Sequence, residues 1–105
     1  MTPEARVKEQ VKAVLKKLGV QYFMPSAGVY GRSGASDFIC CMGGRYVAIE
    51  TKATARDRPT KLQQLFLDQV RRCGGMALVV SADNVGTLET LLRNGLLEEE
   101  LVHAH

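Results

Sequence analysis

Three residues of the sequence have the types and spacing for metal or acid–base chemistry: Asp37, Glu50 and Lys52. Carboxylate oxygens are the ligands that hard divalent cations such as Mg²⁺ take. A desolvated lysine close to such a cation has a lowered pKa and can move a proton or stabilise negative charge. Glu50 and Lys52 are two residues apart, so on a β-strand they point to the same face. Whether Asp37 joins them depends on how the strands pair.

The pairing is predicted by two β-prone runs, residues 36–42 and 45–53, which are separated by Gly43-Gly44. Such a dipeptide between two strand-like runs indicates a hairpin. With the turn centred between the two glycines, Asp37 faces Glu50, whereas a loop of odd length would break this register. Directly opposed residues have Cβ atoms roughly 4.5–5.5 Å apart. The sequence therefore predicts two carboxylates side by side at the open end of the hairpin.

Opposed like charges destabilise a sheet, so something must offset the repulsion between Asp37 and Glu50. A divalent cation would do so, because it binds carboxylate oxygens. Lys52 would also do so alone, as a structural ion pair. The residues by themselves leave both interpretations open.

The elements that position these residues are predicted in the order α-β-β-β-α-β-α. They are a helix from the Thr2 cap to Gly19, a strand at 20–24, a loop at 25–35, the hairpin at 36–53, a helix from Thr60 to Gly74-Gly75, a strand at 76–81, and a helix from Asp83 or Asn84 to near Gly95.

The predicted fold class is α/β, with a mixed sheet flanked by helices. The strand–helix–strand unit at 45–81 predicts parallel strands joined by a right-handed crossover, and the antiparallel hairpin makes the sheet mixed. Both faces of the hairpin are apolar, so helices should cover both. The inward face of the second helix is predicted to carry Leu62, Leu65, Phe66, Val70 and Cys73.

The segments Gly34-Ala35-Ser36-Asp37 and Glu50-Thr51-Lys52 resemble the PD-(D/E)XK nuclease signature. The wider pattern, which runs from about residue 3 to residue 92, resembles the virus-type replication-repair nuclease (VRR-NUC) domain, especially its small stand-alone phage and bacterial members. It comprises Glu4 in a first helix, then YFMP, a Gly-rich loop, G-x-S-D-F, A-I-E-T-K-A, P-T-x-L-Q and a G-G before an apolar strand. Ser36 departs from it, because the family usually has proline there. The resemblance implies a restriction-endonuclease-like (PD-(D/E)XK) core.

The resemblance also implies a role for each matching residue. Asp37, Glu50 and the backbone carbonyl of Thr51 would bind Mg²⁺ or Mn²⁺. Lys52 would orient or deprotonate the attacking water and stabilise charge on the phosphate. Glu4 would contact the metal through water, and Gln63 would support the site.

Two of these residues have a second interpretation. Glu4 lies in the first turn of a helix, where any acid gains from the dipole. Gln63 follows Thr60 at the spacing of a capping box. Phosphate contacts are predicted for a further set, which could equally be solvated loop residues: Tyr30, Arg32, Arg56, Arg58 and Lys61.

The 105 residues fit one domain, predicted at residues 1–97, with an acidic, frayed tail at 98–105. Residues 1–97 hold all 14 basic residues and eight of the 11 acidic ones, a net charge of +6. This basic excess permits DNA as the partner. The resembled family includes Holliday-junction resolvase-like enzymes, so branched or four-way DNA is expected. A chain too small to wrap a junction alone is expected to form a two-fold homodimer.

The first residues are charged and no apolar run could span a bilayer, so we expect no signal peptide and no membrane. The expected location is the cytoplasm of a bacterial or phage-infected cell. The function that the resemblance implies is a metal-dependent DNA endonuclease that hydrolyses phosphodiester bonds. The alternative is a non-catalytic basic DNA-binding module, which would not need the Asp37, Glu50 and Lys52 set.

Overall fold

The structure is a computed structural model that describes residues 1–26 and 34–94. Its elements follow the predicted order. They are α1 (Pro3–Lys17), β1 (Gln21–Phe23), β2 (Phe38–Met42), β3 (Arg45–Thr51), α2 (Lys61–Arg72), β4 (Met76–Val80) and a 3₁₀ turn, η1 (Val85–Thr87), which continues as α-helix over residues 88–94. The predicted loop at 25–35 and tail at 98–105 fall largely or wholly outside the described residues.

The four strands form one mixed sheet in the order β1-β2-β3-β4. Strands β1 and β3 both run antiparallel to β2, whereas β3 and β4 are parallel. Within the β2–β3 hairpin, Cys40 pairs with Val47 and Phe38 with Ile49, which is the predicted register. Gly43 (φ 59°) and Gly44 (φ 78°) both have left-handed backbone conformations, as a tight two-residue hairpin turn demands.

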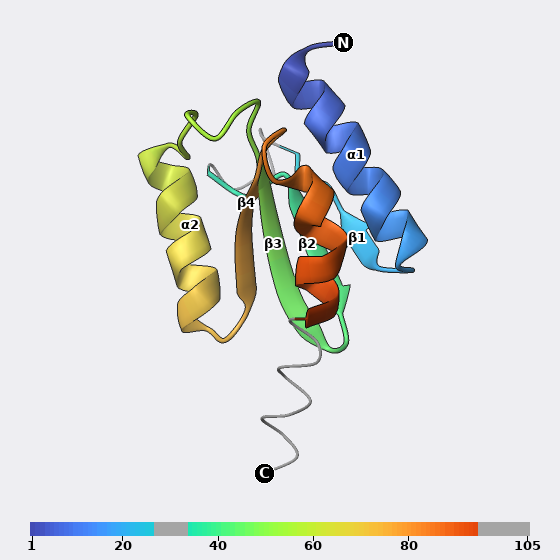
Figure 1. The fold of residues 1–105 in the computed structure, drawn as a ribbon. Coiled ribbons are helices and arrows are strands. Elements are labelled where there is room, and N and C mark those ends of the chain that lie inside the picture. Colours follow the sequence, from blue (N-terminus) through green and yellow to red (C-terminus); the bar gives the residue numbers. More distant parts are fainter. Residues whose placement is uncertain (27–33, 95–105) are drawn as a thin grey trace.

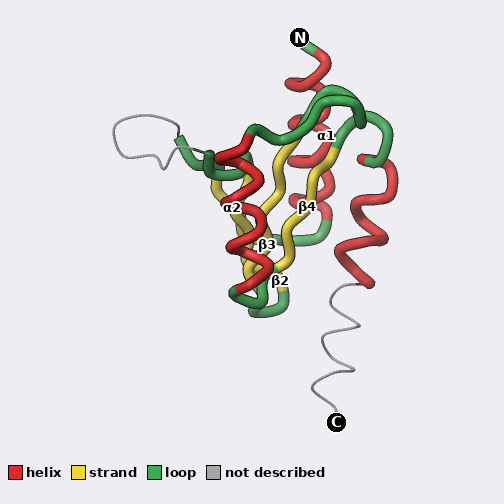
Figure 2. Tube along the Cα trace, turned by 90° about the vertical axis from the view of Figure 1, so that its left-hand side faces the viewer, coloured by secondary structure: helices red, strands yellow, loops and turns green. Residues whose placement is uncertain are grey.

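Helices cover both faces of the sheet, as the apolar hairpin predicted (Figure 1). Helix α1 and the helix at residues 88–94 lie on one face, and α2 lies on the other. Figure 2 shows α2 in front of the sheet, and this helix contacts β3 and β4. The strands supply alternate residues to two cores, because side chains along a strand point to opposite faces. Phe38 and Ile49 pack in the core under α1, and Ile39 and Ala48 pack in the core under α2.

The predicted inward face of α2 is partly wrong. Leu67 (0% exposed) and Val70 are the buried residues of this helix, whereas Leu62 (53%) and Leu65 (52%) are exposed, as is Cys73. Phe66 packs at the margin of the core. The apolar residues of α2 fit more than one stripe, and the packing against β3 and β4 selects the one centred on Leu67.

Gly34 lies where the chain approaches the first turn of α2, a few residues before the start of β2. Its φ is +84°, and a Cβ added there would lie 2.7 Å from both the carbonyl carbon and the Cβ of Leu62. Backbone atoms cannot move aside as a flexible side chain would. Only glycine fits this contact, which brings the segment leading into β2 against the start of α2.

We predict that Gly34→Ala destabilises the fold more than Gly44→Ala does. Both glycines have positive φ, so either alanine costs roughly 1–2 kcal/mol of unfolding free energy in backbone strain. At Gly44 an added Cβ meets nothing within 4 Å. At Gly34 it meets Leu62, which adds overpacking and brings the loss to about 3 kcal/mol or more. Urea unfolding of the two variants measures the difference, and equal losses would contradict the close contact.

Candidate active site

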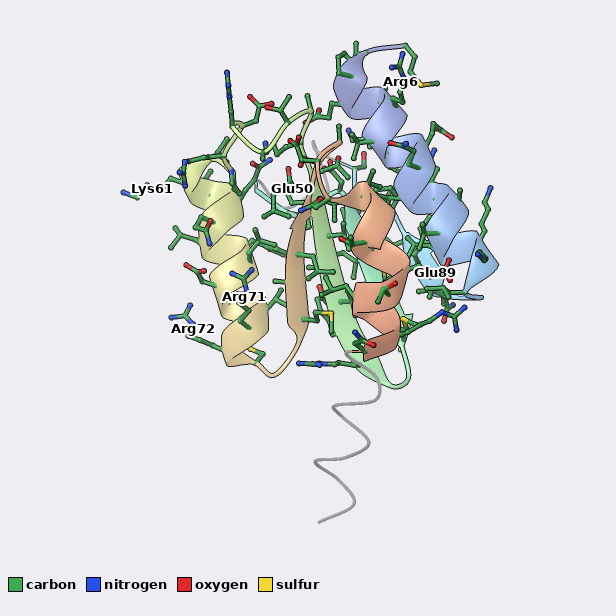
Figure 3. All side chains as sticks on the ribbon, viewed as in Figure 1. Arg6, Glu50, Lys61, Arg71, Arg72 and Glu89 are labelled. Carbon is green, nitrogen blue, oxygen red and sulfur yellow. The ribbon has the colours of Figure 1, made fainter. Side chains whose placement is uncertain are left out.

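Asp37 and Glu50 lie at the open end of the β2–β3 hairpin, as predicted. Asp37 directly precedes β2, and Glu50 follows Ile49, which pairs with Phe38. One further step in this register places Asp37 opposite Glu50. Glu50 is 2% exposed and lies near the end of β3, close to where the chain leaves the sheet (Figure 3). The structure therefore brings one buried and one half-buried carboxylate together.

Thr51 fixes the orientation of the Asp37 carboxylate. Asp37 Oδ2 accepts a hydrogen bond from the backbone N–H of Thr51 at 2.8 Å and another from Thr51 Oγ1 at 2.7 Å. The side-chain hydroxyl of Thr51 thus has a role that the sequence did not predict. The predicted role of its backbone carbonyl as a metal ligand stays a prediction.

Lys52 lies on the same side of β3 as Glu50, as predicted. Its Nζ is 3.5 Å from Glu50 Oε2 and donates a hydrogen bond to Gln63 Oε1 at 3.1 Å. Gln63 also completes the capping box of α2, where its Oε1 accepts from the Thr60 N–H at 2.9 Å. Gln63 therefore caps the helix and contacts Lys52, while its role in catalysis stays a prediction.

Helix α1 adds a lysine that the sequence reasoning missed. Lys8 Nζ lies 3.6 Å from Asp37 Oδ1 and 4.0 Å from Glu4 Oε2. Glu4 is therefore at the edge of the site and linked to Asp37 through Lys8. The signal was present in the spacing: Lys8 follows Glu4 by four residues and precedes the buried Val11 and Leu15 by three and seven.

The Glu50 carboxyl group has a strongly perturbed acidity. Its pKa is raised from 4.5 to about 7, first by burial and second by the neighbouring Asp37 carboxylate, whereas Lys52 acts in the opposite direction. Burial dominates because a charged carboxylate loses its hydration there. A perturbed acid that sits between a second carboxylate and a lysine is typical of functional sites.

The donor set fits a hard divalent cation. Glu50 Oε1 is buried and has no hydrogen-bond partner among the described residues, a property that it shares with Ser36 Oγ. The described residues contain no group of three or more His, Cys, Asp and Glu side chains that could hold a metal. Two carboxylates suffice for Mg²⁺, because this ion keeps several waters and takes substrate phosphate oxygens as further ligands.

The loop between β3 and α2 presents basic side chains at the same end of the sheet. Arg56, Arg58 and Lys61 are all exposed. Asp83 Oδ2 accepts a hydrogen bond from the Ala55 N–H at 2.7 Å, which ties this loop to the segment that follows β4. Lys61 points away from Glu50 (Figure 3). Tyr30 and Arg32 lie outside the described residues.

The fold and the site together define a class: a mixed α/β domain with paired carboxylates and a lysine at the end of the central hairpin. A search of solved structures finds a chain titled "VRR_NUC domain", with a TM-score of 0.73 and 29% sequence identity. The match covers 84% of this chain and 95% of that one. No family model matches the chain. A search of curated proteins also finds no match.

The structural match and the sequence pattern agree, and both support a VRR-NUC domain. The restriction-endonuclease-like architecture expected from the resemblance agrees with the mixed sheet and its flanking helices. Ser36, where the family usually has proline, is buried and its hydroxyl is unpaired within the described chain. The Ser36 hydroxyl therefore makes no hydrogen bond within the described chain that a proline at this position would lose.

We predict that the metal-free protein loses stability as the pH rises from about 4.5 to about 7. Glu50 has a pKa near 7 when folded and 4.5 as an ordinary glutamic acid. Between these values the folded state holds more protons, so the unfolding free energy falls with pH. The full loss is about 3 kcal/mol. Glu50→Gln should abolish this pH dependence and be more stable than the wild type at pH 8.

Chemical unfolding in EDTA at pH 5 and pH 8 measures this effect. Glu9→Gln is the matched control, because Glu9 is exposed and paired with Lys12 on the outer side of α1. It should keep the pH dependence of the wild type. The same pH dependence in Glu50→Gln as in the wild type would show that Glu50 does not hold a proton in the folded state.

Proposed function

We propose that the chain is a divalent-metal-dependent DNA endonuclease that hydrolyses phosphodiester bonds. The observation that carries this proposal is the buried Glu50, which lies beside Asp37 and Lys52 and has a carboxylate oxygen without a partner within the described chain. A protein that needed only an internal ion pair would not bury a second carboxylate next to the first. The structural similarity to a VRR-NUC domain supports the same conclusion, because such domains are generally nuclease domains.

In the proposed mechanism, Asp37, Glu50 and the Thr51 carbonyl would hold Mg²⁺ or Mn²⁺. When bound there, such a cation would lower the pKa of a water and offset negative charge on the phosphate. Thr51 keeps the Asp37 carboxylate in one orientation through its two hydrogen bonds. Gln63 holds the Lys52 ammonium beside Glu50. From there Lys52 orients or deprotonates the attacking water and stabilises the negative charge that develops on the phosphate.

DNA is the proposed partner, and the loop at residues 54–59 is its proposed contact. Arg56 and Arg58 are exposed on this loop, and Asp57 and Asp83 hold its backbone. A preordered basic loop can bind phosphates without first losing conformational entropy. We further propose a four-way or other branched DNA as substrate and a two-fold homodimer as the active form, since a chain of 105 residues can contact only part of a junction.

A cytoplasmic location in a bacterial or phage-infected cell follows from the proposed substrate. Among the described residues, no helix is long and apolar enough to cross a membrane. A non-catalytic DNA-binding module is the rival function. It accounts for the basic loop but gives no reason for the buried carboxylate or for the Lys52–Gln63 contact.

The test is cleavage of labelled four-way, flap and linear DNA with Mg²⁺, Mn²⁺ or EDTA. We expect cleavage only with a divalent ion, and light scattering on the same sample should give twice the 11.5 kDa chain mass. Lys52→Met, which keeps the apolar stem, should lower the single-turnover rate at least about 100-fold. DNA affinity should change little, because one phosphate contact among many is lost.

Lys16→Met is the matched control, because Lys16 is an exposed lysine in the last turn of α1 and has no part in the proposed site. Both rates are measured well below the thermal midpoint of each variant, since Lys52→Met also removes a partner of the buried Glu50. Metal-independent binding without cleavage would favour the binding module. A lower midpoint with an unchanged rate would make Lys52 a structural ion pair.

The basic loop should make DNA binding sensitive to salt. If Arg56 and Arg58 each contact a phosphate, replacing both with alanine should reduce the slope of log affinity against log salt by about 2, because fewer counterions are released. Replacing Arg71 and Arg72 removes the same charge from the far end of α2 (Figure 3) and should leave the slope nearly unchanged. Equal slopes for the two double variants would place the DNA elsewhere.

A further inference from the structure

Lys8 occupies a position that the proposed function does not use. It lies on α1, and its Nζ is 3.6 Å from Asp37 Oδ1 and 4.0 Å from Glu4 Oε2. Its side chain is 31% exposed and that of Asp37 is 23% exposed. The ammonium is therefore neither locked in the core nor fully in solvent, and it can leave Asp37 without disturbing the packing of α1.

The two oxygens of Asp37 have different partners. Oδ2 accepts both hydrogen bonds from Thr51, whereas Oδ1 faces Lys8. A cation that binds Asp37 without breaking the contacts to Thr51 must therefore use Oδ1. Lys8 is paired with the oxygen that a divalent ion would need.

The site carries two lysines for its two facing carboxylates. Lys52 lies 3.5 Å from Glu50 and Lys8 lies 3.6 Å from Asp37. Together they offset the repulsion that opposed carboxylates create in a sheet. A divalent ion between Asp37 and Glu50 would repel both ammonium groups at close range. Lys52 is also held by Gln63, whereas the second partner of Lys8 among the described residues is the partly exposed Glu4, at 4.0 Å.

We propose that Lys8 is the resident counter-cation of Asp37 and that it competes with the divalent ion for the Asp37 Oδ1 atom. Lys8 keeps the facing carboxylates together while the site is free of metal, and it moves toward solvent when the ion binds. This inference rests on the proposed function, because it takes Asp37 as a metal ligand.

Calorimetric titration with MgCl₂ and MnCl₂, in the absence of DNA, tests the competition. Lys8→Met should bind the ion about fivefold to tenfold more tightly than the wild type, because the ion no longer displaces a positive charge. Lys8→Arg keeps that charge and should bind as the wild type does. Lys12→Met is the matched control, because Lys12 is equally exposed on the same helix but is paired with Glu9 at 3.1 Å. It should change the affinity less than twofold.

The outcomes separate this inference from the proposed function. Tighter binding in Lys8→Met alone supports the competition. An equal affinity in Lys8→Met and Lys12→Met, or a weaker one in Lys8→Met, overturns it while leaving the metal site in place. If the wild type releases or absorbs no binding heat and its thermal midpoint does not rise with either ion, the metal site itself is refuted, and this inference falls with it.

Discussion

The register of the β2–β3 hairpin is the constraint on which the rest of the site depends. It sets Asp37 against Glu50 at one end of the sheet. Two facing carboxylates, one of them buried, are unfavourable in an isolated domain. The surrounding contacts can be understood as offsets: Thr51 donates two hydrogen bonds to Asp37, Lys8 reaches across from α1, and Lys52 pairs with Glu50.

The residues that offset the cost of the two carboxylates come from segments that are distant in the sequence and meet at one end of the sheet. Helix α1 supplies Lys8, and the first turn of α2 supplies Gln63. The close approach of Gly34 to Leu62 brings the segment before Asp37 against that same turn of α2. The site therefore depends on the packing of both helical layers, and a change in either layer would alter the environment of the carboxylates.

The offsets are incomplete, because one oxygen of Glu50 has no partner within the described chain and its pKa remains near 7. A buried and imperfectly paired acid lowers stability, and proteins keep such groups where function requires them. In the proposed nuclease, a divalent ion would complete the pairing. The same electrostatic repulsion that costs stability in the metal-free protein would then provide the affinity for the cation.

The sequence by itself determined the order of elements, the mixed sheet and the facing of Asp37 and Glu50, because the period of a strand and the Gly43-Gly44 turn act locally. It also placed Lys52 on the side of Glu50. Tertiary structure decided which stripe of α2 is buried, the contact of Lys8 with Asp37 and the double role of Gln63. These features depend on how α1 and α2 pack on the sheet. Local periodicity predicts which residues share a helix face, but it does not predict which part of the sheet that face contacts.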